Sequence, residues 1–363
     1  MKTFLLHLRR LDWILFVSVL LLVGIGLLSI YSISLGKGDF FNFKKQLIFI
    51  GIGIVLMFFA SFFDWRGFRD NSYFILLLYF ICIALLIGLF FFAPEIRGVK
   101  SWYKVGPFSF DPIGITTIVL IILLAKFFSV RHIEMYRLSH ILLSGLYVFI
   151  PFILISRQPN LGSALILIVL WFGILLISGI KLKHFFILVL CGLMITTLGW
   201  FFLLRDYQKE RIISFIVPQI EPLGISWSQN QAKIAIGSGG IWGKGIGKGS
   251  QTQYGFLTEP HTDFIFSAIA EEFGLVGIVF LLFLFAVLIW RIMKIAFVAI
   301  SNFPRIFATG FSIVLMCQVF IHIGMNLGIL PVIGISLPLV SYGGSNLIAI
   351  SLGIGILQSI KTH

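Results

Sequence analysis

The sequence predicts an all-α integral membrane protein of about ten transmembrane helices. Apolar residues make up 59% of the 363 residues and charged residues only 11%, whereas soluble domains carry about 25% charged residues. Apolar runs of about 18 residues or more recur along the whole chain, and each is long enough to cross a hydrocarbon core about 30 Å thick. We therefore expect one polytopic membrane domain over residues 1–363, without a separate soluble domain.

The order of the apolar segments predicts the topology. The expected spans cover residues 12–33, 46–64, 73–93, 112–128, 140–156, 161–179, 184–204, 263–290, 305–328 and 343–360. An even number of crossings places both termini on one side. Lys and Arg are about twice as frequent in the loops that a cytoplasmic N-terminus puts inside as in the short loops outside. We therefore expect both termini in the cytoplasm.

One long hydrophilic stretch, residues 205–262, lies between the seventh and eighth spans and is expected outside. Its basic residues and those of the shorter outer loops predict a cationic face suited to an anionic ligand, although scattered solvated charge is an alternative. A glycine run at 237–249 permits positive φ and close approach of backbone N–H groups to a ligand. Lys244 and Lys248 lack the glycine that a phosphate-binding loop places six residues earlier, so no nucleotide site is expected.

A second irregular stretch, residues 328–345, joins the last two spans. It is apolar, but its prolines and glycines exclude a regular helix. Non-helical backbone at membrane depth persists only where protein buries it or where it lines a wet cavity. We therefore expect a re-entrant segment that lines a cavity open to the outside.

Acidic residues mark the start of the eighth span. Asp263 begins this apolar helix where the long loop ends, close to Glu259 and His261. A helix N-terminus favours negative charge, so Asp263 is either a functional carboxylate of the outer cavity or a helix cap.

Other polar residues lie deeper in the spans. Glu271 and Glu272 follow Asp263 at about 12–14 Å of helix length. We expect them to form structural pairs with inner-end cations such as Arg291. His322 and Asn326 form a polar stripe on the ninth span, either as a functional path or as contacts between helices.

Three runs of sequence resemble the SEDS family, the shape, elongation, division and sporulation proteins. They are QAKIAIGSGG at 231–240, HTDFIF at 261–266, and the stretch from LPV at 330–332 to SYGGS at 341–345. The opening at 8–13 and the turn at 158–163 are more similar to the rod-shape, RodA-like branch than to the division branch. The resemblance implies a ten-helix peptidoglycan glycosyltransferase of the bacterial cytoplasmic membrane, which polymerises lipid II outside the cell during elongation. It also implies a class B penicillin-binding protein as the partner transpeptidase.

The resemblance implies roles for particular residues. Asp263 of the HTDF motif would be the catalytic residue, a general base for the attacking sugar hydroxyl. Cations would stabilise the leaving diphosphate. The implied substrate-binding residues are Lys100, Trp102, Arg211, Gln231, Lys233, Glu259, His261, Ser341, Tyr342, Gly343, Gly344 and Ser345. No cofactor and no metal ligand are assigned, and a divalent cation on the diphosphate is left open.

The chain departs from the family pattern at three positions. A glutamate and a lysine that the family usually carries on the fourth span are replaced by Gly114 and Thr117. Their joint loss indicates that they form a pair elsewhere in the family, because losing one alone would strand a charge in the membrane. Asp111, one turn earlier, is a candidate substitute. Asn160 stands where the family has an aspartate, which excludes an anionic role there.

Two other functions are compatible with the sequence. A lipid II flippase would need functional polar residues at mid-depth, such as His322, Asn326 or Glu271. A scaffold that only positions the partner transpeptidase would not need Asp263.

Overall fold

The computed structural model describes residues 7–94, 101–106, 108–131, 138–158, 160–202, 206–217 and 225–362. Within them, each of the predicted spans coincides with a helix. The helices are α2 (Trp13–Lys37), α3 (Phe41–Phe62), α5 (Ser72–Phe92), α6 (Ile113–Arg131), α7 (Leu138–Arg157), α8 (Leu161–Ile177), α9 (Leu182–Phe202), α13 (Ile265–Val298), α14 (Asn302–Leu327) and α15 (Gly344–Thr362). By length and composition, α2, α3, α5, α6, α7, α13 and α14 can cross a membrane, and α8 and α9 contain shorter apolar helices. The chain is therefore a multi-pass helical membrane protein.

Short elements occupy the connections. They are α4 (Arg66–Asp70), α10 (Asp206–Ile216), α11 (Ile225–Ser238), α12 (Ser250–Gln253), β1 (Tyr103–Val105) and β2 (Phe108–Phe110). The two strands pair antiparallel and were not expected from the sequence. The long hydrophilic stretch thus contains three helices, α10, α11 and α12.

Local chemistry explains where several long helices begin and end. Side-chain oxygens of Asp12, Asn71 and Asn160 accept backbone N–H groups in the first turns of α2, α5 and α8. Gly38 and Gly328 take left-handed φ angles of 65° and 74° at the C-terminal ends of α2 and α14. Glycine is favoured there because it has no Cβ to clash in this conformation.

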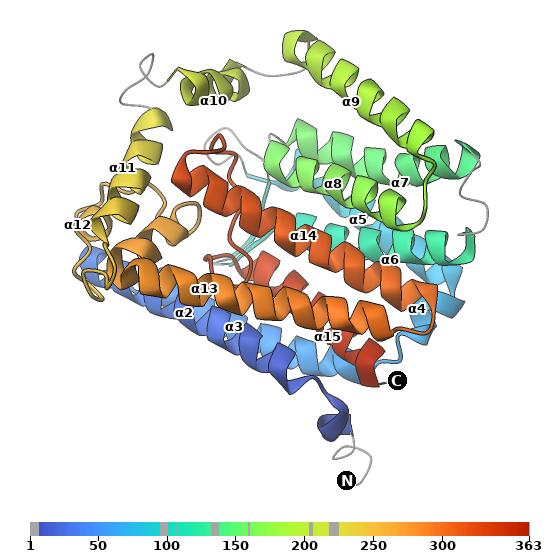
Figure 1. Cartoon of the computed structure of the whole chain (residues 1–363), viewed down its shortest axis with the longest axis horizontal. Helices are drawn as coiled ribbons and strands as arrows, with labels where there is room; N and C mark the ends of the chain where they lie inside the picture. Colours follow the sequence, from blue (N-terminus) through green and yellow to red (C-terminus); the bar gives the residue numbers. More distant parts are fainter. Residues whose placement is uncertain are drawn as a thin grey trace.

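The centre of the bundle is built around α14 and α15 (Figure 1). The α15 helix packs against α3 and α6, and α14 packs against α13, α6 and α8. A Cβ on Gly355 of α15 would lie only 2.6 Å from the carbonyl oxygen of Met57 on α3. Small residues at such crossings allow the close van der Waals packing that holds helices together in lipid.

The start of α2 and the end of α15 lie at one end of the bundle, away from α11 and α12 (Figure 1). Three segments meet there at the buried carboxylate of Asp12, which binds Arg291 at the end of α13 and Lys361 at the end of α15. Gln358 of α15 also donates to the Asp12 carbonyl at 3.0 Å. The sequence-based expectation that Arg291 pairs with Glu271 or Glu272 is therefore wrong: Arg291 lies at the opposite end of α13 and pairs with Asp12.

Removing the Asp12 charge should destabilise this end of the bundle. Burial alone would raise the pKa of Asp12, but hydrogen bonds from Arg291 and the Leu15 backbone, with the charge of Lys361, hold it below its usual value. We expect Asp12→Asn to lower the free energy of unfolding at pH 7 by about 3 kcal/mol, because two cations lose their partner. The measurement is thermal unfolding of the purified protein in detergent.

A matched control is Asp70→Asn, which removes an exposed carboxylate beside Arg69 and should be nearly neutral. Because the pKa of Asp12 is depressed, its contribution is present above about pH 4 and is lost as the carboxyl protonates below that. The difference between wild type and Asp12→Asn should therefore shrink as the pH falls below about 4. A difference that stays constant down to pH 2 would contradict the ion-pair explanation.

Candidate functional site

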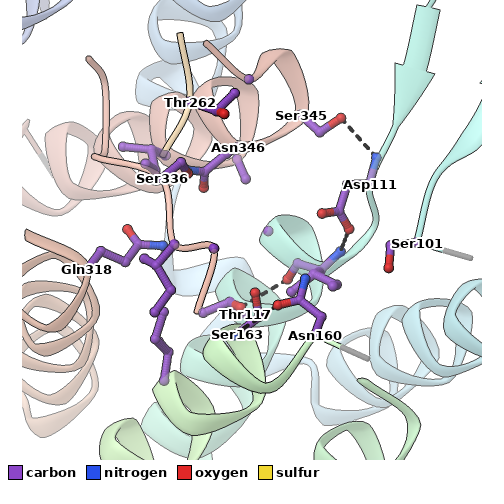
Figure 2. A pocket seen from close by; sticks show the side chains of 18 of the residues that line it. Ser101, Asp111, Thr117, Asn160, Ser163, Thr262, Gln318, Ser336, Ser345 and Asn346 are labelled. Carbon is purple, nitrogen blue, oxygen red and sulfur yellow. Dashed lines mark hydrogen bonds between the residues drawn. The ribbon is translucent and has the colours of Figure 1, made fainter. Parts of the chain in front are cut away.

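A cavity of about 500 Å³ lies where the strands, the starts of α6 and α8, the turn before α13 and the segment between α14 and α15 meet. This volume is within the range of small-molecule sites, about 300–1,000 Å³. Figure 2 shows polar side chains from several elements around it. Its polar lining comprises Ser101, Trp102, Ser109, Asp111, Thr117, Asn160, Ser163, Glu259, Thr262, Asp263, Gln318, Ser336, Tyr342, Ser345 and Asn346. Asp111, Glu259 and Asp263 are the charged residues in this described lining.

A tight turn positions Asp263 in the cavity wall. The carbonyl oxygen of Glu259 accepts the backbone N–H groups of Thr262, Asp263 and Phe264 at 3.2, 3.2 and 3.4 Å. Glu259 itself has a φ of 45°, which is strained for a residue with a Cβ. Such conformations cost about 1–3 kcal/mol and persist where surrounding contacts determine them.

The surrounding contacts come from the segment between α14 and α15. The Ser341 hydroxyl donates to the Thr262 carbonyl at 2.8 Å, and the Tyr342 N–H donates to the His261 carbonyl at 2.8 Å. Asn326 of α14 donates to the Asp263 carbonyl at 3.0 Å. The predicted re-entrant segment therefore lines the cavity and also fixes the backbone that carries Asp263.

The polar stripe on α14 serves as contacts between elements. Asn326 accepts the hydroxyl of Ser267 at 2.6 Å, which ties α14 to α13. His322 donates through Nδ1 to the Ile335 carbonyl at 2.7 Å, which ties α14 to the re-entrant segment. Of the two interpretations left open by the sequence, these contacts favour the structural one.

The α13 helix is broken at Gly274, and the glycine run of the long loop crosses the break. Gly274 has a φ of 66° and a ψ of −162°, outside the helical region. The N–H groups of Leu275 and Val276 donate to the carbonyls of Gly240 and Ile241 at 2.9 and 3.1 Å. In return, the N–H groups of residues 244 and 245 donate to carbonyls on the other side of the break at 3.0 Å. The loop thus satisfies the backbone groups that the break leaves open.

Three glycines of this run, Gly239, Gly243 and Gly249, lie directly against α13. A Cβ on Gly243 would overlap the carbonyl of Glu272, and a Cβ on Gly249 would lie 2.6 Å from Glu271 Oε2. The absence of side chains at these positions is what lets loop and helix backbones touch.

Glu271 and Glu272 bind this loop. Glu271 is fully buried and accepts Lys244 Nζ at 2.9 Å. It also accepts the Thr252 hydroxyl at 2.8 Å. Glu272 is hydrogen-bonded to the hydroxyl of Ser32 on α2. Glu271 therefore forms an ion pair, but with Lys244 of the long loop and not with an inner-end cation, and Glu272 bonds neutral groups of the loop and α2.

The predicted site residues fall into three groups. Trp102, Glu259, Asp263 and residues 342–345 line the cavity. Gln231, His261 and Ser341 are buried but are not lining residues. Lys233 is exposed, and its side chain lies against Gly328 at the end of α14. Lys100 and the side chain of Arg211 lie outside the described residues.

The structure adds lining residues that the sequence analysis did not place in the site. Gln318 comes from the middle of α14, and Ser163 comes from the first turn of α8. In the sequence, these two residues could be recognised only as polar residues inside apolar spans.

Burial raises the pKa of Asp111 to about 6, although the hydrogen bond that its carboxylate accepts from the Ile113 N–H lowers the pKa. Within the described residues, no three His, Cys, Asp or Glu side chains form a group suited to a metal ion.

Fold and site together define a polytopic helical membrane protein with an acidic, polar cavity at one end of its bundle. A family model described as a cell cycle protein, covering FtsW, RodA and SpoVE, matches residues 12–363. The chain belongs to this family, and the resemblance to SEDS proteins is confirmed.

Curated relatives agree with this membership. The chain is 41% identical to the peptidoglycan glycosyltransferase MrdB of Escherichia coli strain K12 over 286 residues, which cover 79% of this chain and 77% of that protein. It is 34% identical to the stage V sporulation protein E of Bacillus subtilis over 364 residues, covering 97% of each.

Solved structures agree as well. A chain of a peptidoglycan synthase complex superposes with a TM-score of 0.82 at 30% identity, covering 97% of both chains. The rod shape determining protein RodA of Thermus thermophilus superposes with a TM-score of 0.72 at 29% identity, covering 97% of this chain and 96% of that one.

Proposed function

We propose that this protein is a peptidoglycan glycosyltransferase that polymerises lipid II on the outer face of the bacterial cytoplasmic membrane during cell elongation. The observation that carries the proposal is the placement of Asp263. Asp263 lines the cavity just before a helix start, its backbone is bonded to Glu259 and Asn326, and the segment between α14 and α15 holds the two residues before it. Glycosyl transfer requires a positioned base that takes the proton of the attacking hydroxyl, and a carboxylate can serve as this base.

The reaction joins a sugar hydroxyl of one substrate to the anomeric carbon of another, which carries a lipid diphosphate. The hydroxyl oxygen forms the new glycosidic bond as the bond from the anomeric carbon to the diphosphate oxygen breaks. Asp263 takes the hydroxyl proton, a contribution of about 10²–10⁴-fold for a general base. The electron pair leaves with the diphosphate, whose charge Lys100 and Arg211 would stabilise.

The composition of the cavity suits an amphiphilic substrate. Its polar lining is continuous with an apolar wall between α8 and α14, formed by Ile166, Phe311, Val314 and Leu315. A saccharide and diphosphate fit the polar part, and the lipid chain fits the apolar wall.

The outer location of the site is supported by the arrangement of the bundle. Ser32 on α2 meets Glu272 on α13, and Asp12 on α2 meets Arg291 on α13. The 20 residues between the two α2 positions span about 30 Å, the thickness of a hydrocarbon core. With the N-terminus inside, the Asp263 end of α13 therefore reaches the outer surface.

A class B penicillin-binding protein is the partner we propose. The related chain from the peptidoglycan synthase complex comes from a structure concerned with coordinating polymerization and crosslinking. A polymerase of this kind needs a transpeptidase to crosslink its product.

The test uses the purified protein in liposomes supplied with lipid II, with and without a class B penicillin-binding protein. We expect glycan chains, scored by gel electrophoresis of labelled product. A second measurement follows transfer of labelled lipid II between leaflets. Transfer without polymer would support a flippase instead. A lack of both polymer and transfer, even with the partner present, would support a scaffold.

A further inference from the structure

Asp111 places a carboxyl in the cavity wall without a cationic partner in the described part of the chain. It lies between β2 and α6, and its Oδ1 accepts the Ile113 N–H at 2.9 Å. Its own N–H donates to the Ser345 hydroxyl at 2.9 Å, which fixes it relative to the turn before α15. The second carboxyl oxygen has no hydrogen bond to any described residue, although Asp111 lines the cavity.

The charge of Asp111 is not needed for the fold. Capping α6 requires one side-chain oxygen, which an asparagine supplies equally well. The carboxylate instead carries a desolvation cost, since burial raises its pKa to about 6. A group that opposes folding when ionised, and that faces a cavity, is a candidate for function.

Two amide side chains in the same cavity have unused hydrogen-bonding capacity within the described residues. Asn160 caps α8 through Oδ1, which accepts the Ser163 N–H at 3.2 Å, and its amide nitrogen is left over. Gln318 has a buried Oε1 without a partner. In the view of Figure 2, Gln318 and Asp111 lie on opposite sides, with Asn160 and Thr117 between them. Asp111 offers an acceptor to a ligand and the amide nitrogen of Asn160 offers a donor, and the Gln318 amide lines the same cavity.

We propose that Asp111 binds the saccharide of the substrate, with Asn160 and Gln318 completing a subsite for uncharged hydroxyl and amide groups. Sugar hydroxyls both donate and accept, and an N-acetyl group adds one amide donor and one carbonyl acceptor. Trp102, in the same lining, offers an apolar face to a sugar ring. A peptide amine is the other ligand that a carboxylate takes, but the two neighbouring amides favour the saccharide. The inference rests on the proposed function and deepens it.

The first test compares wild type with Asp111→Asn in the lipid II polymerisation assay. The variant keeps the cap, so we expect it to fold with equal or higher thermal stability at pH 7. Loss of a charged hydrogen-bond acceptor should raise KM by about ten- to a hundredfold with little change in kcat. Asp39→Asn is the matched control, because Asp39 Oδ1 accepts the Phe41 N–H at 2.8 Å in the same local geometry outside the cavity.

Two measurements separate saccharide binding from a structural role. Protonation of Asp111 should raise the wild-type KM as the pH falls below about 6, and Asp111→Asn should remove this dependence. The other ionisable side chains of the described cavity lining, Glu259, Asp263 and Tyr342, are all retained in the variant. Saturation-transfer NMR with the free N-acetylated disaccharide should show binding to wild type that Asp111→Asn and Gln318→Met weaken.

The outcomes distinguish the subsite from the proposed function. Polymerisation by wild type together with a wild-type KM in Asp111→Asn would overturn the subsite alone, as would a loss of kcat at unchanged KM. Failure of wild type to polymerise would overturn the proposed function. Disaccharide binding that depends on Asp111 would still support the subsite in that case.

Discussion

Asp263→Asn should reduce glycan polymerisation by about 10²–10⁴-fold while leaving the fold intact. Asparagine has nearly the same shape as aspartate, and the hydrogen bonds that fix this turn use the backbone of Asp263. The amide cannot take the proton of the attacking hydroxyl, so chemistry should slow while substrate binding is largely kept. The loss should therefore appear in kcat, measured with saturating lipid II.

Thermal unfolding in detergent provides the control for the fold, and Asp70→Asn provides a matched acidic substitution at the other end of the bundle. The Asp70 carboxylate is exposed beside Arg69 and should leave polymerisation unchanged. Equal amounts of polymer from wild type and Asp263→Asn would remove Asp263 from the mechanism. That result would leave a non-catalytic role for this turn.

The helices could be predicted from the sequence because each depends on a local property. A long apolar run must become a helix in lipid, where all backbone groups need internal partners. The ends were predicted less well: α13 extends to Val298 and α2 to Lys37, beyond the apolar runs. The β hairpin before α6 was missed because each strand is only three residues long.

Pairings between distant segments could not be predicted in the same way. Arg291 was expected to bind acids on its own helix, because the sequence gives only distances along one element. Its actual partner, Asp12, lies on α2 at the same depth, which depends on how two helices are packed. Glu271 likewise binds Lys244, a loop residue that the sequence assigned to the outer surface.

The candidate site was predicted where its residues share a short motif. Asp263 and the turn at 341–345 are recognisable along the chain, and both reach the cavity. Gln318 and Asn160 come from different helices, and only packing brings them to the same cavity as Asp111. The glycine run has a role that the sequence did not indicate, which is contact with a broken helix.

Gly243→Ala tests that contact and should destabilise the protein by more than about 4 kcal/mol. Gly243 has a φ of 79°, which disfavours any side chain, and its Cβ would overlap the backbone carbonyl of Glu272. Backbone cannot move aside as a flexible side chain can, so the loop must leave the break in α13. The open N–H and carbonyl groups at Gly274 would then lose their partners.

Gly237→Ala is the control for this substitution, because it lies in α11 of the same loop and a Cβ there meets no atom within 4 Å. Alanine should stabilise that helix slightly, by up to about 1 kcal/mol. Both variants are compared by thermal unfolding and by limited proteolysis of the long loop. Because the half of α13 before Gly274 begins next to Asp263, Gly243→Ala should also lose polymerisation, whereas Gly237→Ala should keep it. Normal stability of Gly243→Ala would show that the loop does not hold the broken helix together.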